Sequence, residues 1–182
     1  MSKAVLISIK PKWCEKIING DKTIEVRKTR PKLDTPFKCY IYCTLPKYPH
    51  EDFIATNYPR PQFYGGGKVI GEFTCDRIYE LEAKARGGSY YVKNEDQPTT
   101  NFIARQSCLD LKDMHDYLHA QTGYGWHITD LRIYDTPKCL FEFWAERLCR
   151  REPSVFGCGE CCDCDKRAPQ SWCYVQEVAC DE

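Results

Sequence analysis

Three charged side chains follow one another at short, fixed offsets near the start of the chain, and together they offer the chemistry of phosphate or base recognition. Lys22 supplies a compact positive charge, Glu25 can accept from an exocyclic amine, and Arg27 carries a planar fork that fits a phosphate or a guanine edge. The candidate binding residues are these three with two polar neighbours: Lys22, Thr23, Glu25, Arg27 and Lys28. Lys22 and Glu25 are also the candidates for any acid–base catalysis.

The segment that carries these residues changes from a helical to an extended pattern. Residues 11–18 are predicted to form a short helix, because a proline in the first turn costs no hydrogen bond and one face is apolar. An Asn-Gly pair then ends the helix. Beyond it, apolar and polar residues alternate as in a strand, so we expect Ile24 and Val26 to be buried. The charged residues then share the other face, beside the helix, with Lys22 at the mouth of a groove.

This segment resembles the signature of a known domain family. The pattern Gly20-x-Lys22-x-x-Glu25-x-Arg27 is similar to that of the ASCH domain of bacterial and phage proteins, a small β-barrel related to the PUA domains that bind RNA. Three later segments also resemble the family: Gly71-Glu-Phe, Gly125-Trp-His-Ile-Thr-Asp-Leu and Pro169-Gln-Ser-Trp-Cys-Tyr-Val. The resemblance covers most of the chain and implies an α+β fold, a PUA-like β-barrel with flanking helices. It also implies that the charged residues form the floor of a cleft between the barrel and the first helix.

A structural explanation competes with this functional one. On a solvated strand face, Lys22, Glu25 and Arg27 would form cross-strand ion pairs worth about 0.2 to 1 kcal/mol each. The resemblance favours the cleft.

A cluster of cysteines near the end of the chain has the spacing of a zinc site. Cys158-x-x-Cys161 allows both sulfurs to reach one ion, and Cys164 adds a third ligand. Cys149, Cys162 and Cys173 are candidates for the fourth position, and we prefer Cys149 because adjacent cysteines rarely bind one ion together. We predict a structural zinc held by Cys149, Cys158, Cys161 and Cys164. Free thiols, or a disulfide formed on oxidation, are the alternatives.

Composition limits the kind of protein. The 182 residues, of which 42% are hydrophobic, can build a proper core, and we predict one domain over 1–182. An aromatic, proline-rich insertion at about 45–67 and a cysteine-rich loop at about 149–166 interrupt it. No apolar run reaches the roughly 18 residues of a membrane span, and the first residues read as a strand rather than a signal peptide, so we expect a cytoplasmic protein without membrane association. The 26 basic and 26 acidic residues balance, which excludes coating of nucleic acid by bulk charge.

Local charge and periodicity add further expectations. Lys and Arg outnumber Asp and Glu between Lys3 and Lys38, and the dense run 28–32 is either a rim that faces phosphates or a solvated loop. Period-two patterns predict strands at 37–44, 68–78, 126–134 and 171–178, the last returning into the barrel. Ser107 is expected to cap a helix that ends before Gly123, and His115 and His119 to be solvated or capping residues rather than metal ligands.

Three functions are compatible with these observations. We favour a module that binds RNA or a nucleotide through the charged cleft. A hydrolase acting on RNA or a modified nucleoside is the alternative, and a module that binds a protein partner through the aromatic insertion and the cysteine cluster is the third. Some small ASCH proteins hydrolyse acetylated cytidine with a lysine and, three residues later, a nucleophilic threonine. That position is Glu25 here, so the resemblance does not extend to that reaction.

Overall fold

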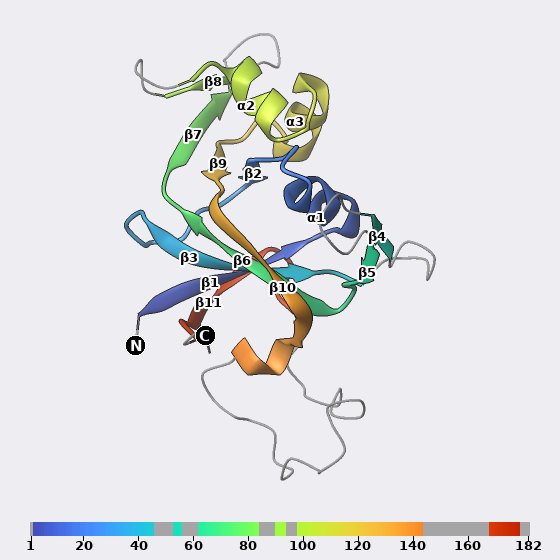
Figure 1. The fold of residues 1–182 in the computed structure, drawn as a ribbon. Coiled ribbons are helices and arrows are strands. Elements are labelled where there is room, and N and C mark those ends of the chain that lie inside the picture. Colours follow the sequence, from blue (N-terminus) through green and yellow to red (C-terminus); the bar gives the residue numbers. More distant parts are fainter. Residues whose placement is uncertain are drawn as a thin grey trace, which may run out of the picture.

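The computed structural model describes residues 2–45, 53–55, 62–83, 90–93, 98–143 and 168–178, and this part of the chain forms two β-sheets with three α-helices (Figure 1). The five-stranded sheet has the order β10-β6-β3-β1-β11. Its strands are β1 (Lys3–Ile9), β3 (Phe37–Cys43), β6 (Lys68–Cys75), β10 (Thr129–Cys139) and β11 (Trp172–Gln176). The four-stranded sheet, of order β2-β9-β7-β8, consists of β2 (Ile24–Arg27), β7 (Ile78–Ala83), β8 (Tyr90–Val92) and β9 (Gly123–His127).

Helices cover both sheets. α1 (Pro11–Ile18) packs beside the five-stranded sheet, while α2 (Thr100–Gln106) and α3 (Leu111–Leu118) cover the four-stranded one (Figure 1). A 3-10 helix, η2 (Leu140–Phe143), follows β10, and a separate hairpin pairs β4 (Phe53–Ala55) with β5 (Gln62–Tyr64). That hairpin lies within the predicted proline-rich insertion, and neither of its strands contains a proline. Within the described residues, no helix is long and apolar enough to cross a membrane.

The prediction of a closed barrel is wrong for the described part of the chain, although the mixed α+β class is confirmed. The outer strands of the five-stranded sheet, β10 and β11, do not pair with each other. Instead β6 continues into β7 and β9 into β10, so one long antiparallel pair passes through both sheets. Where β6 passes into β7, its outer neighbour changes from β3 to β8, so the continuing strand belongs to the second sheet.

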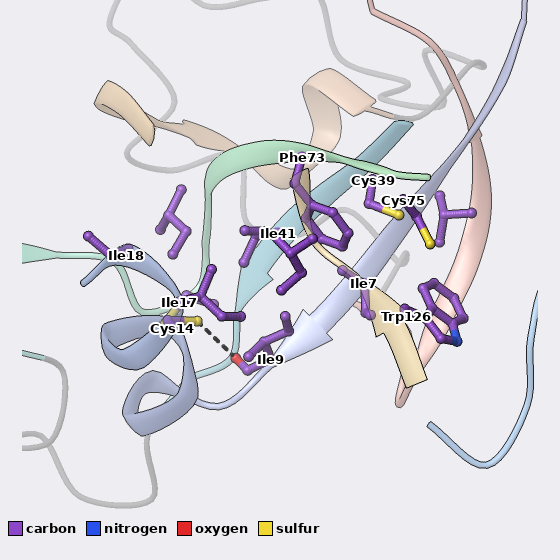
Figure 2. Packing of buried hydrophobic residues seen from close by; sticks show 14 of the residues in the cluster. Ile7, Ile9, Cys14, Ile17, Ile18, Cys39, Ile41, Phe73, Cys75 and Trp126 are labelled. Carbon is purple, nitrogen blue, oxygen red and sulfur yellow. Dashed lines mark hydrogen bonds between the residues drawn. The ribbon is translucent and has the colours of Figure 1, made fainter. Parts of the chain in front are cut away.

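The core consists of three apolar clusters. The largest lies between the five-stranded sheet and α1, and Figure 2 shows it running from Ile17 of α1 past Ile41 and Phe73 to Trp126 of β9. The second packs Ile24 and Val26 against α2 and α3, as the alternation of β2 predicts. The third covers the opposite face of the five-stranded sheet.

Tyrosines of β3 belong to this third cluster. From the alternation of this strand we expect Tyr40 and Tyr42 to face outward, into a cleft or a covering loop. Both are buried, and the ring of Tyr40 lies 4.7 Å from that of Phe143 in η2. The covering segment is therefore the 3-10 helix.

Several predicted boundaries need correction. Ser107 closes α2, a helix that the sequence did not reveal, and Asp110 caps α3 by accepting from the backbone N–H of Asp113. β10 continues through Pro137, because the register of its pairing with β6 shifts between Ile133 and Lys138. The segment therefore pairs on either side of a bulge that accommodates the proline.

The strand at 171–178 was predicted correctly. β11 pairs antiparallel with β1 and so returns to the main sheet. In β6, a Cβ on Gly71 would lie 2.5 Å from the backbone oxygen of Arg132 in β10, so the glycine leaves room for the close approach of that strand.

Candidate functional site

The turn between α1 and β2 positions the charged residues. Gly20 takes a left-handed φ of 79° directly after α1, where a side chain would be strained. The backbone N–H of Lys22 donates to the oxygen of Lys16, and that of Thr23 to the oxygen of Gln106. These bonds fix the start of β2 between α1 and the end of α2. β2 is also an edge strand, paired with β9 alone among the described strands.

Glu25 joins the two cations. Its Oε2 lies 3.1 Å from Lys22 Nζ and its Oε1 lies 3.0 Å from an Arg27 terminal nitrogen. The residues are 3%, 6% and 6% exposed for Lys22, Glu25 and Arg27. Burial excludes the solvated strand face that competed with the functional explanation. Lys22 was expected at the mouth of a groove, and this expectation is wrong, because Lys22 is the most buried of the three.

The hydrogen-bond donors of Lys22 are all used within the protein. Its ammonium group donates to the backbone oxygens of Ile24 at 2.9 Å and Ser107 at 2.7 Å, besides its contact with Glu25. Three acceptors match the three N–H groups of a lysine. Because Ser107 ends α2, the charge also lies at the negative end of that helix. Lys22 therefore holds Glu25 and α2 together.

Arg27 is less completely satisfied. One terminal nitrogen donates to the backbone oxygen of Ser8 in β1 at 2.6 Å, and the other lies 3.4 Å from Ser171 Oγ, just before β11. Its Nε–H is buried and has no acceptor in the described part of the chain. Two cations and one carboxylate leave the cluster with an excess of one positive charge, and Glu25 is its one acidic partner among the described residues.

Two aromatic residues that the sequence did not mark lie beside this cluster. Lys22 Nζ is 5.2 Å from the centre of the Trp13 ring in α1. Tyr117 of α3 is 39% exposed, and its pKa is raised mainly by burial, with the charge of Glu25 raising it and that of Arg27 lowering it. The charges of Glu25 and Arg27 therefore act on the pKa of Tyr117 in opposite directions. No local pattern could connect Tyr117 with the signature, because they lie far apart in the sequence and only the fold brings them together.

The remaining candidates occupy different positions. The hydroxyl of Thr23 donates to the side-chain oxygen of Gln106, which fixes β2 on α2. Lys28 is exposed, with its Nζ 5.3 Å from the centre of the Tyr117 ring. His119 closes α3 in a left-handed conformation, as a capping residue.

The predicted zinc ligands Cys149, Cys158, Cys161 and Cys164 lie outside the described residues. Of the other candidates, Cys162 is also outside, and Cys173 lies in β11 against the third cluster. In the part of the chain that is described, no three His, Cys, Asp or Glu side chains gather as metal ligands. The zinc site stays a prediction.

Comparison with known proteins decides the fold. No family model and no curated protein matches this sequence. Solved structures do match: the crystal structure of ASCH from Zymomonas mobilis gives a TM-score of 0.56 at 16% identity, covering 96% of this chain and 88% of that one. This chain has the ASCH fold. Two mutants of the Zymomonas mobilis protein give the same TM-score and identity, covering 97% and 96% of this chain and 92% and 89% of theirs. The ASCH fold accounts for the chain from β1 to β11.

Proposed function

We propose that this ASCH-fold protein binds RNA or a nucleotide, with a phosphate group directed at Arg27. The observation that carries the proposal is the buried charged cluster, whose excess positive charge and unpaired Arg27 Nε–H lack a complement in the described structure. A buried N–H without an acceptor costs about 1 to 3 kcal/mol, and a phosphate oxygen would remove that cost. An anion would also balance the charge, and an arginine fork suits a phosphate.

Aromatic side chains favour a nucleotide over a simple anion. Trp13 lies beside Lys22, and Tyr117 lies under Lys28, the residue after Arg27, so rings flank the cluster. A base stacked on an aromatic ring contributes about 1 to 3 kcal/mol irrespective of its sequence. The combination of a phosphate-binding arginine with flanking rings fits a nucleotide unit better than a free phosphate.

The candidate residues then have different roles. Arg27 contacts the phosphate, and Lys28 is the exposed cation next to it. Lys22 and Thr23 position the strand through their bonds to the end of α2. Glu25 orients both cations, and a second lone pair on one of its oxygens would accept from an exocyclic amine.

Binding of fluorescein-labelled diuridylate (U2) to wild type, Arg27→Lys and Lys28→Ala tests the proposal. Arg27→Lys keeps the charge and removes the fork, so we expect U2 to bind about ten times more weakly, within the roughly 1 to 3 kcal/mol of a bidentate contact. Lys28→Ala should have a smaller effect. Thermal melting of each variant checks that it is folded. A folded Arg27→Lys protein that binds U2 as tightly as wild type would refute the assignment.

Hydrolysis is less well supported by the geometry. All three donors of Lys22 have partners, and each oxygen of Glu25 already accepts from a cation. Acid–base catalysis by either residue would first have to break an ion pair. Chromatography of the same RNA after prolonged incubation tests this alternative directly, since cleavage or base modification would produce new species.

A further inference from the structure

The loop that follows Arg27, residues 28–32, is fastened across β11. Trp172 Nε1 donates to Thr29 Oγ1 at 3.0 Å, and the backbone N–H of Lys32 donates to the Tyr174 hydroxyl at 2.6 Å. Pro31 between them is buried. The basic run of the sequence is therefore a held surface that leads from the charged cluster toward β1 and β11.

Cations of this surface lie over aromatic rings and stay exposed. Lys28 Nζ is 5.3 Å from the centre of the Tyr117 ring, and the Arg30 guanidinium is 6.0 Å from that of Tyr124. At the far end, Lys3 Nζ is 5.7 Å from the centre of the Tyr174 ring. The four basic side chains, Lys3, Lys28, Arg30 and Lys32, are all exposed.

Rings continue beneath the basic residues. Trp126 and Trp172 have ring centres 5.9 Å apart, and Trp172 and Tyr174 have ring centres 5.4 Å apart. Tyr174, 41% exposed, ends this row, and Tyr117, 39% exposed, lies under Lys28 at the start of the basic loop. An exposed ring at each end provides a stacking surface for a base.

The charge of this surface differs from that of the whole chain. Residues 28–32 contain three cations and no acid, whereas the chain as a whole has a formal net charge of zero. Glu177, which directly follows β11, is paired with Lys38 at 3.4 Å. Exposed cations alternating with rings complement the phosphates and bases of a single nucleic-acid strand, whose bases, unlike those of a duplex, are free to stack on protein.

We propose that a single RNA strand of several nucleotides binds along this surface, from Arg27 over loop 28–32 to Tyr174. Its phosphates contact Lys28, Arg30 and Lys32, and a base stacks on Tyr174. This extends the proposed function, since it begins at the phosphate bound by Arg27, and it identifies the ligand as a strand rather than a free nucleotide.

The test compares labelled octauridylate (U8) with U2 over a range of salt concentrations. The triple variant Lys28→Ser, Arg30→Ser, Lys32→Ser should lose at least tenfold in affinity for U8, and its logarithmic salt slope should fall by about 2, as expected for three lost phosphate contacts to a single strand. Its affinity for U2 should change less than threefold. The matched control is Lys93→Ser, Arg105→Ser, Lys112→Ser, which removes three exposed cations near α2 and α3 and should leave the U8 affinity unchanged.

Tyr174 provides a second, independent variant pair. Tyr174→Phe keeps the ring but loses the hydroxyl that accepts from the Lys32 N–H, so it should bind U8 within about threefold of wild type, while Tyr174→Ala should bind it about tenfold more weakly because stacking is lost as well. Thermal melting checks that both are folded.

The proposal is overturned if wild type binds U8 no more tightly than U2, if the two triple variants behave alike, or if an eight-base-pair RNA duplex binds as tightly as U8. Each of these results leaves the Arg27 site intact provided that Arg27→Lys still weakens U2. Loss of that Arg27 dependence instead refutes the proposed function.

Discussion

For single residues, burial changes what the charged signature means. Lys22, Glu25 and Arg27 are ordinary strand-surface residues by type. The fold nevertheless buries them, with hydrogen bonds from β2 and its start to β1 and to the end of α2. Removing one partner of a buried ion pair leaves the other charge and its hydrogen-bond partners uncompensated. The cluster therefore contributes to stability as well as to the proposed binding.

Lys22→Met should lower the free energy of unfolding by about 3 to 5 kcal/mol, because Glu25 loses one cation and two backbone oxygens lose their donor. Urea denaturation at neutral pH measures this loss. Lys112→Met, at an exposed ion pair, should remain close to wild type. A Lys22→Met protein within about 1 kcal/mol of wild type would mean that the cluster is not a buried network.

The buried thiols predict a loss of stability at alkaline pH. Burial raises the pKa of Cys75 from 9.0 to about 12. Its folded-state pKa is above the unfolded value, so its contribution is complete below pH 9 and is lost as the pH rises toward 12. Urea denaturation should give a free energy of unfolding that falls above pH 9, and Cys75→Ala should reduce the slope. Equal slopes for wild type and Cys75→Ala would contradict this assignment.

Among the elements, two glycines set the geometry around the site for different reasons. Gly20 has a left-handed φ, but a Cβ added there would meet nothing within 4 Å, so its requirement is conformational. Gly71 has no such φ, and its requirement is space, since Arg132 of β10 approaches it closely. One glycine ends α1 before the charged strand, and the other allows β6 and β10 to pair tightly.

Gly20→Ala should therefore cost about 1 kcal/mol, from left-handed strain alone, and Gly20→Asn less, because asparagine tolerates that conformation. Gly71→Ala should cost about 2 to 3 kcal/mol, because β6 and β10 must separate. Chemical denaturation of the three variants gives the comparison. The reverse order of costs between Gly20→Ala and Gly71→Ala would show that backbone strain at the helix end outweighs crowding between β6 and β10.

Across the whole molecule, Arg27 connects distant parts of the chain. It lies in the four-stranded sheet and bonds to β1 and to Ser171 before β11, both parts of the five-stranded sheet and its approach. The cysteine-rich segment immediately precedes this approach in the sequence. A zinc ion held by it would restrain the chain entering β11.

The zinc prediction is tested on the full chain purified without chelator. We expect about one equivalent of zinc by elemental analysis and a lower melting temperature after chelation, because structural zinc contributes directly to folding. Cys158→Ser and Cys161→Ser should both lose the metal, while Cys108→Ser, a partly exposed thiol beside α2, should retain it. A zinc content below about a tenth of an equivalent in the wild-type protein would show that these cysteines are free thiols rather than metal ligands.

Local elements of this protein follow from the order of its residues alone. Proline, an apolar face and an Asn-Gly pair placed α1 at residues 11–18, and strict alternation placed Ile24 and Val26 in the core. These features depend on neighbours along the chain, so a periodic pattern is sufficient to predict them. The prediction failed at α2, whose seven residues are too few to show a clear period.

The covering of the charged face of β2, in contrast, depends on the tertiary fold. Period two assigns Glu25 and Arg27 to one face, but the hydrogen-bond partners of the charged cluster, Ser8, Ser107 and Ser171, come from three distant segments. The same holds for Tyr117 and for the basic loop held on Trp172 and Tyr174. Strand order and register decide which residues far apart in the sequence become hydrogen-bond partners. The long strands change partners between the sheets, and the described strands therefore form two open sheets rather than one barrel.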